Sequence, residues 1–359
     1  MLNPYFNLFK VKYEILTNLL RESKDIKVSL KDNINVFIDL EPILIKLANT
    51  YINDYIKSGD KSIVYEFISN IVNLAAHYRW FFTKHKLTSR IYLCMPSITT
   101  KEFKNTAYHS DYRKYFTFKF LSDVNNEPLT GLICNSIDYI KLIVEYIQGV
   151  YFIESGPIEN SVIPYVINKY NDDNSINFLV TNSSYNFQYV NHNCNIIVPR
   201  KDDSVLLTKR NIIEFIADIH DCNGNYTINS NMVPFILSIT GNKYRNIYNI
   251  KRMQMKSTFK LIQKALNANL ISNNITNIYM LSQTMIPSVR DQLILNYNLT
   301  DIESQYNRLN KKDLFSIYDQ LKDKLDNVSL KKINDKLFIK DPLMLVEITT
   351  IPYKGNVKF

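Results

Sequence analysis

Glycine, tryptophan and cysteine are scarce in this chain of 359 residues, which has seven, one and four of them respectively. The glycine-rich loop that cradles phosphates, the GxSxG turn of serine hydrolases and the HExxH helix of zinc proteases do not occur. Four dispersed cysteines do not form a disulfide framework, and we expect them to be free thiols. The sequence therefore gives no support to a nucleoside triphosphatase, a serine hydrolase or a zinc protease.

Long uncharged apolar runs are also missing. The segments IDYIKLIVEYI (137–147) and MVPFILSI (232–239) are too short or too charged to span the hydrocarbon core of a bilayer, which is about 30 Å thick. The first 20 residues lack the charged region, apolar run and cleavage site of a secretory signal. We expect no membrane partner and no secretion through a signal peptide.

The composition is that of a globular protein, with 46% hydrophobic and 21% charged residues. A formal net charge of +9 permits a polyanionic partner without requiring one. Asparagine, isoleucine, tyrosine and lysine are abundant, a bias that an AT-rich genome such as that of a phage or a parasite would produce. We therefore expect the protein in a virion or in the host cytoplasm.

Strand-like and helical patterns alternate along the first two thirds of the chain. Short β-rich segments occur at 34–40, 90–97, 150–155, 177–184 and 194–199. Helical periodicity occurs at 43–58, 63–85, 136–148, 158–170 and 209–220. Because parallel strands need crossover connections, this alternation predicts an α/β fold with a parallel sheet flanked by helices.

The chain divides into three predicted parts. Residues 1–30 form an N-terminal helical extension, and residues 31–229 form the α/β domain. Residues 230–359 form a mainly helical C-terminal region with a basic segment and a β-like tail, LMLVEITTI (343–351).

Ligands of open parallel sheets bind beyond the carboxyl ends of the strands. The residues at those positions include Asp39, Glu154 and the segment 182–185. The order of the segments, with the fragments TNSSYNFQYV (181–190) and LSITGNKYRNIYNI (237–250), resembles the flap endonuclease and 5′-3′ exonuclease branch of the PIN-like nucleases. The resemblance covers roughly residues 34–265. It implies a parallel α/β sheet followed by DNA-binding helices, and acidic residues that hold two divalent ions for phosphodiester cleavage.

The acidic residues of that family are mostly replaced here. Asp39 matches the aspartate of the first strand, but the second strand ends in Met95, Pro96 and Ser97 without an acid. In the next acidic motif, Asn160 and Ser161 stand where the family has aspartates, and only neighbouring Glu159 or Glu154 could substitute. Two further motifs place neutral or basic residues at acidic positions: Ser183, Tyr185, Asn242 and Arg245.

These replacements predict a pseudonuclease. Neutral side chains cannot offset two divalent ions, so we expect no cofactor, with Asp39 and Glu159 only weak candidates for metal ligands. With the phage-like composition, the replacements suggest a structural or assembly component of a virion, such as a head-tail connector or a tail ring. Its partners would then be other virion proteins or further copies of the chain.

Three alternatives remain open from the sequence. The chain could be an active Mg²⁺-dependent 5′-nuclease with a reduced site of Asp39, Glu154 and Glu159. It could bind DNA without cleaving it, through basic residues that follow the last motif: Lys243, Arg245, Lys251, Arg252 and Lys256. Two His-x-Cys pairs could also bind structural zinc: His192 with Cys194, and His220 with Cys222.

Overall fold

The computed structural model describes most of the chain between residues 33 and 321. The described ranges are 33–58, 61–84, 88–95, 127–145, 147, 149–154, 162–171, 175–200, 204–222, 224–241, 247–250, 253–272, 278–283 and 287–321. The predicted N-terminal helical extension and β-like tail lie outside these residues.

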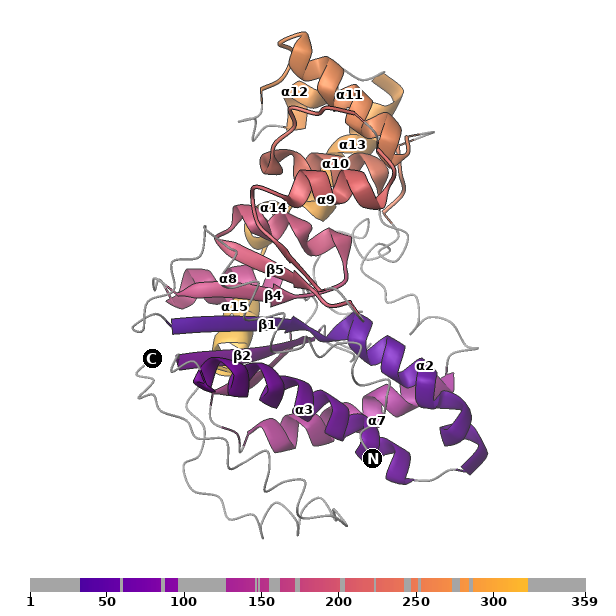
Figure 1. Cartoon of the computed structure of the whole chain (residues 1–359), viewed down its shortest axis with the longest axis vertical. Coiled ribbons are helices and arrows are strands. Elements are labelled where there is room, and N and C mark those ends of the chain that lie inside the picture. The colour runs from indigo at the N-terminus through magenta and orange to yellow at the C-terminus, as the bar shows by residue number, and fades with distance from the viewer. Residues whose placement is uncertain are drawn as a thin grey trace.

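A sheet of six strands forms the centre of the molecule, in the order β3-β2-β1-β4-β5-β6 (Figure 1). The strands are β1 (Asn33–Asp39), β2 (Thr88–Met95), β3 (Val150–Glu154), β4 (Ile176–Val180), β5 (Cys194–Val198) and β6 (Val205–Leu207). The first five are parallel, which confirms the predicted fold class. Strand β6 was not predicted and is antiparallel to β5, since the short link between them has no room for a crossover helix.

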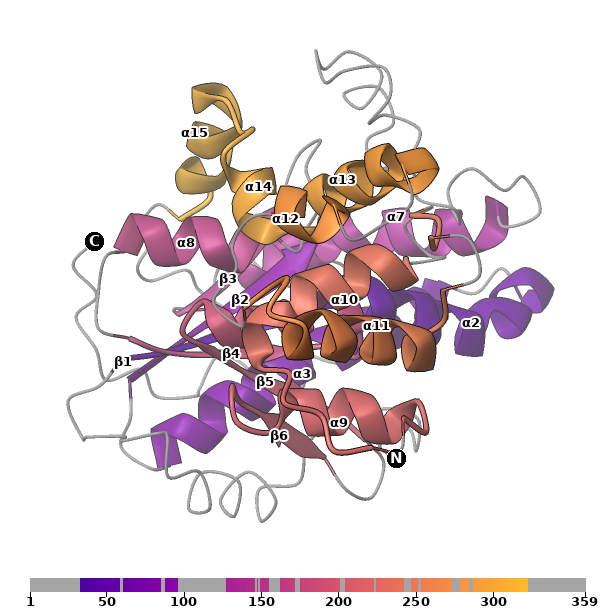
Figure 2. The ribbon, with the colours of Figure 1, turned by 90° about the horizontal axis from the view of Figure 1, so that it is seen from above.

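Helices cover both faces of the sheet. One face is covered by α2 (Leu40–Ser58), α3 (Lys61–Lys84) and α7 (Glu127–Val144), which lie together on one side in Figure 1. The other face is covered by α8 (Ile163–Asn171), the 3₁₀ helix η4 (Ser184–Asn191) and α9 (Ile212–Ile219). Figure 2 shows the same strands and helices from above.

Alternate residues of each strand point to opposite faces, and this determines where the strand-end residues lie. In β1, Val36 and Ile38 pack in the core beneath α2, α3 and α7, whereas Phe37 packs in the other core. The Phe37 ring stacks on Tyr92, and Tyr92 stacks on Tyr151, with centroid separations of 5.0 and 5.2 Å across β1, β2 and β3. Asp39 follows Phe37 by two residues and therefore belongs to the face that α8 and η4 cover.

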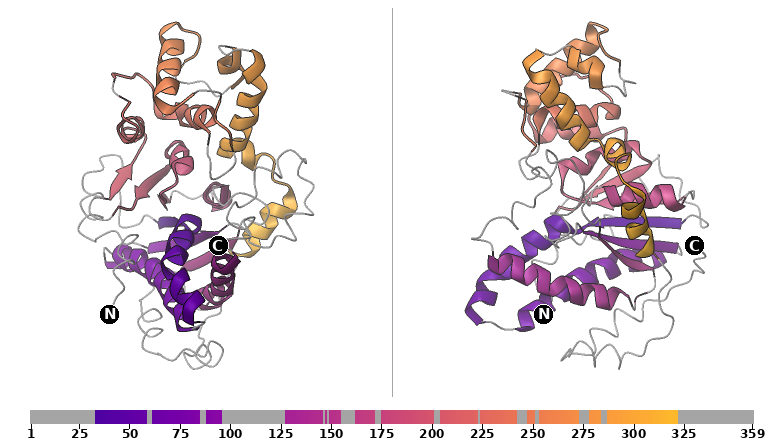
Figure 3. Two further views of the ribbon diagram at one scale, coloured as in Figure 1. Left: turned by 90° about the vertical axis from the view of Figure 1, so that its right-hand side faces the viewer. Right: turned by 180° about the vertical axis from the view of Figure 1, so that it is seen from behind.

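The C-terminal region is helical, as predicted, in the part of it that the structure describes. It contains η5 (Ser230–Met232), α10 (Val233–Thr240), α11 (Met255–Asn267), α12 (Ile278–Gln283), α13 (Pro287–Thr300), α14 (Ile302–Tyr306) and α15 (Lys311–Asp319). Helices α10 to α13 extend away from the sheet, while α15 returns beside it (Figure 3). The hydrophobic core of the second sheet face continues into α10, α11 and α13. The domain division at 229/230 stays a prediction.

Several predicted elements differ from the structure at their ends, and two of these differences are the most informative. The strand predicted over 177–184 ends at Val180, because the Thr181 hydroxyl accepts a hydrogen bond from the backbone N–H of Ser183 (3.0 Å) and turns the chain into η4. The helix predicted over 136–148 begins at Glu127 and ends at Val144. Within the described residues, no helix combines the length and apolarity needed to cross a bilayer.

Candidate functional site at the carboxyl ends of the strands

Asp39 is buried at the end of β1 and is held by two side chains that follow β4. Its Oδ2 accepts hydrogen bonds from the Thr181 hydroxyl (2.8 Å) and from Nδ2 of Asn186 (2.9 Å). The Asn186 nitrogen also donates to the Thr181 oxygen (3.1 Å). All three residues are at most 3% exposed. Oδ2 of this buried carboxylate is thus bonded by two protein donors, as buried charges require.

Tyr185 stands at a position where the sequence resemblance implies an aspartate, and its side chain has a structural role. It is 1% exposed, and its hydroxyl donates to the carbonyl oxygen of Leu299 (2.5 Å) and also contacts Gln305. Gln188, one turn on in η4, donates to the carbonyl of Thr300 (2.8 Å) and accepts from the N–H of Ile302 (3.1 Å). These contacts fasten η4 to the junction of α13 and α14. Ser183, which also stands where the resemblance implies an aspartate, directly precedes η4 and is partly buried.

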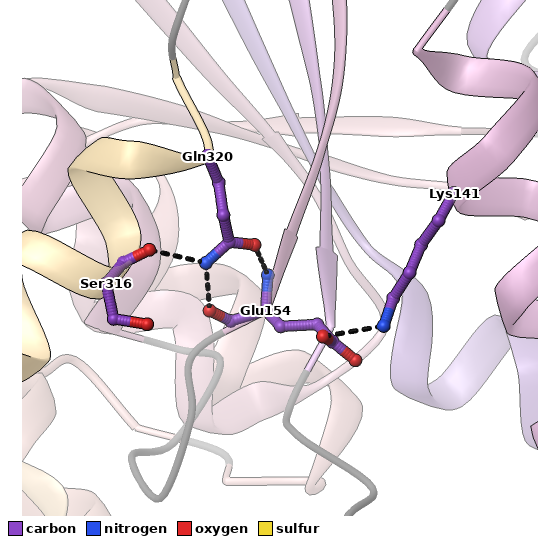
Figure 4. A network of polar contacts seen from close by, with 4 residues as sticks. All are labelled: Lys141, Glu154, Ser316 and Gln320. Atoms are coloured by element: carbon purple, nitrogen blue, oxygen red, sulfur yellow. Dashed lines mark hydrogen bonds and ion pairs between the residues drawn. The ribbon is translucent and has the colours of Figure 1, made fainter.

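Glu154 at the end of β3 is held by different elements (Figure 4). Its Oε2 pairs with Nζ of Lys141 on α7 at 2.7 Å, with side chains 26% and 35% exposed. Gln320, directly after α15, bonds the backbone of Glu154. The Gln320 Oε1 accepts a hydrogen bond from the Glu154 N–H (2.7 Å), and the Gln320 Nε2 donates one to the Glu154 carbonyl (2.9 Å). The same Nε2 also donates to the carbonyl of Ser316 (2.9 Å). The Gln320 amide therefore bonds the edge strand as a neighbouring strand would.

Asp39 and Glu154 do not converge on one site. Glu154 lies in register with Met95 of β2, which packs in the core beneath α7, whereas Asp39 is on the opposite face. Strand β2 also separates the two strands, a spacing of roughly 10 Å. Among the described residues, no group of three or more His, Cys, Asp or Glu side chains could hold a metal ion.

The described residues therefore do not fit a pair of divalent ions, which needs several carboxylates in one pocket. Of the predicted ligands that the structure describes, Asp39 alone lies on this face. The predicted site residues Glu159, Asn242 and Arg245 lie outside the described residues.

Cys94 is the sulfur-bearing neighbour of Asp39. It lies opposite Asp39 in the pairing of β1 with β2 and is 2% exposed. Burial raises the pKa of its thiol well above the usual range, and the charge of Asp39 raises it further. A protonated thiol is a poor nucleophile and a poor metal ligand, so Cys94 adds neither function to the site.

The four residues of the hypothetical zinc site are all described, and they form no such cluster. His192 packs edge-on against Tyr165, and burial lowers its pKa. Cys194 is buried in the sheet, where burial raises its thiol pKa. Cys222 places its sulfur 3.6 Å from the carbonyl oxygen of His220. The zinc hypothesis is wrong, because the two pairs serve separate packing and capping contacts.

The predicted basic segment is described only in part. Lys243, Arg245, Lys251 and Arg252 lie outside the described residues. Lys256 is exposed in the first turn of α11, and Lys260 and Lys264 follow it at spacings of four residues, both exposed. Because residues four apart share a helix face, these lysines form a row along α11, which we call the α11 lysine row.

The loop before α11 depends on a glycine that the sequence motif includes. Gly241 has φ +70°, and a Cβ on it would lie 2.5 Å from backbone atoms of Ile247 and Asn249. The buried Asn296 of α13 closes this loop by donating to the carbonyls of Ser238 (2.8 Å) and Tyr248 (2.7 Å). A substituted residue at 241 would therefore strain both the backbone and this clamp.

Sequence reasoning missed Thr181, Asn186, Lys141 and Gln320. Thr181 and Asn186 lie within the fragment that carries the family resemblance. They are five residues apart, and the 3₁₀ helix η4 brings both side chains to Asp39. Gln320 is 166 residues from Glu154, and no local pattern indicates that contact.

Comparison with solved structures identifies the class of fold. The 5′-exonuclease of phage T5, in a structure with bound zinc ions, matches with a TM-score of 0.50 and 10% identity, over 80% of this chain and 98% of that chain. A structure of the bacteriophage T5 flap endonuclease, in a pseudo-enzyme–product complex with DNA and metal ions, has 11% identity, the same coverage and a TM-score of 0.48. No family model and no curated protein matches the sequence. The chain therefore has a flap-endonuclease-like fold, as the resemblance implied; at this identity the likeness shows the fold alone.

Proposed function

We propose that this chain is a pseudonuclease, a protein that keeps the flap-endonuclease-like fold without its phosphodiester cleavage. The observation that carries the proposal is the state of the two strand-end carboxylates. Asp39 is bonded by neutral side chains, and Glu154 pairs with Lys141 on the opposite face. Two divalent ions in one pocket require several converging carboxylates, and these two diverge.

The scaffold then acts as a structural or assembly component, and we propose a phage virion as its setting, in a head-tail connector or a tail ring. The composition, rich in asparagine, isoleucine, tyrosine and lysine, supports a phage origin. The polar ties from η4 to α13 and α14 support a rigid scaffold, because they replace catalytic groups with buried structural contacts. Other virion proteins or further copies of the chain are the partners of this role.

A nuclease assay on the purified full chain tests the catalytic half of the proposal. Flap, nicked and single-stranded DNA are incubated with the protein and either Mg²⁺ or Mn²⁺, beside an Asp39→Asn variant prepared in the same way. We expect no cleavage above the level of the variant. Cleavage by the wild type that the variant loses would establish an active 5′-nuclease that uses Asp39, and would contradict the proposal.

The assembly half is tested on particles. If the chain is a virion component, antibodies against it will detect it in purified particles at a fixed stoichiometry. Recovery of the chain only as a free monomer, absent from particles, would contradict this role.

The α11 lysine row favours a second function, DNA binding without cleavage. Lys256, Lys260 and Lys264 present three positive charges along about 12 Å of helix, which suits contact with successive phosphates. Replacing all three with glutamine should weaken DNA binding and reduce its salt dependence, because each phosphate contact releases condensed counterions. Equal binding by the variant, or binding that salt does not affect, would exclude the row as the contact surface.

A further inference from the structure

Three buried polar groups form a closed triangle beside β1. The Asp39 Oδ2, the Thr181 hydroxyl oxygen and the Asn186 Nδ2 are separated by 2.8, 2.9 and 3.1 Å. Their residues are 3%, 2% and 1% exposed, so bulk water does not solvate the charge of Asp39. The charge has to be compensated inside the protein.

The orientation of the Asn186 amide follows from that charge. A carboxylate repels an amide oxygen, so the amide presents its nitrogen, whose two hydrogens bond Asp39 and Thr181. This choice leaves the Asn186 Oδ1 buried without a hydrogen-bond partner among the described groups. An unpaired buried acceptor is costly, and its presence indicates that bonding the carboxylate determines the arrangement.

Resting on the pseudonuclease function, we propose that the Asn186 amide occupies the place of a cation between Asp39 and Thr181. The amide nitrogen bonds both Asp39 and Thr181 at once, which is the bridging role that an ion has between two oxygen ligands. The site has thereby become independent of metal, and Asn186 is its positioning residue.

The substitution Asn186→Asp tests this role, because it exchanges the nitrogen for a second carboxylate oxygen. Two carboxylates about 2.9 Å apart repel each other in a buried site. In EDTA, we expect the Tm of the variant to fall by about 4 °C or more relative to the wild type. Millimolar Mn²⁺ should restore at least half of that loss, because two carboxylates and a hydroxyl supply three oxygen ligands that bind the ion only in the folded state.

Two controls separate this role from a merely structural one. Asn186→Leu removes the amide without adding a carboxylate, and its Tm should fall by the same amount with and without Mn²⁺. The exchange variant Asp39→Asn/Asn186→Asp keeps one carboxylate and one amide in contact. Its Tm should lie closer to the wild type than that of either single variant, and should not respond to Mn²⁺.

Three results would overturn the proposal. One is a Tm of Asn186→Asp that Mn²⁺ leaves unchanged. The second is an exchange variant no more stable than Asp39→Asn, a comparison that holds even if Asn186→Asp fails to fold. The third is a wild-type Tm that Mn²⁺ raises and that the Asp39→Asn substitution makes insensitive. The nuclease assay on the wild type is independent of the first two, so the amide role can fail while the pseudonuclease function stands.

Discussion

Asp39 and Glu154 end two strands of one sheet, separated by β2, yet their surroundings are opposite in character. Asp39 is 3% exposed and is bonded by neutral groups that follow β4. Glu154 is partly exposed, pairs with a lysine and carries the contacts that attach the end of α15. The difference shows that position at a strand end does not by itself give a carboxylate a shared function. The face on which the strand presents it decides which neighbours it meets.

The largest effect should follow from Asp39→Ala. The substitution leaves the buried donors of Thr181 and Asn186 without their acceptor, and we expect the free energy of unfolding to fall by about 2–4 kcal/mol. Urea unfolding in EDTA measures the change. In a catalytic cluster of mutually repelling carboxylates, loss of one acid usually stabilises the fold, so an increase in stability would contradict the structural role.

An intermediate effect should follow from Gln320→Ala. This change removes both hydrogen bonds to the Glu154 backbone, and we expect a loss of about 1–2 kcal/mol in urea unfolding. Ser316→Ala is the matched control on the same helix, because Ser316 contributes only its backbone carbonyl to the contact. Equal losses in the two variants would show that the Gln320 amide does not hold the end of β3.

A smaller effect should follow from Glu154→Gln. The ion pair with Lys141 is partly exposed, so its loss should cost at most about 1 kcal/mol. The difference from the wild type should shrink as NaCl is raised, because salt screens partly exposed charges. A loss as large as that of Asp39→Ala, or one that salt leaves unchanged, would remove the contrast between the two carboxylates.

The smallest effect concerns His192, whose pKa burial lowers from its usual 6.5. The His192 imidazole therefore binds a proton more readily in the unfolded chain than in the folded one. The free energy of unfolding is undiminished by this group above pH 6.5, and it decreases as the pH falls from 6.5 toward the pKa of the folded state. We expect His192→Gln to flatten the decline of stability between neutral and mildly acidic pH, measured by urea unfolding at each pH. His220→Gln, at an exposed position, is the control; the same flattening in both would contradict a specific role for His192.

The sequence was sufficient to predict the parallel sheet and most of its helices, since strands buried on both faces and helical periodicity are local signals. Strand β6 was missed because it has only three residues. The first turns of α7 were missed because Pro128 and Gly131 weaken the helical pattern, although proline suits a first helical turn.

The candidate site was less accessible to sequence reasoning. The place of Asp39 in the site could be predicted, because the last residue of a parallel strand lies at the carboxyl edge of the sheet, where ligands bind. The face of the sheet on which Glu154 lies could not be predicted. The alternation along β3 shows which residues share a face, but only the register of β3 with β2 shows which face that is. The role of Asn186 depended on a 3₁₀ turn that no short motif indicated.

The most direct test of the account is anomalous diffraction from crystals of the wild-type chain soaked in Mn²⁺, since it locates the ion rather than inferring it. If protein donors compensate Asp39, no anomalous peak will lie within coordination distance of its carboxylate. A peak there, with Asp39 and a second acidic residue as ligands, would contradict the account and would make the carboxyl edge of the sheet a metal centre.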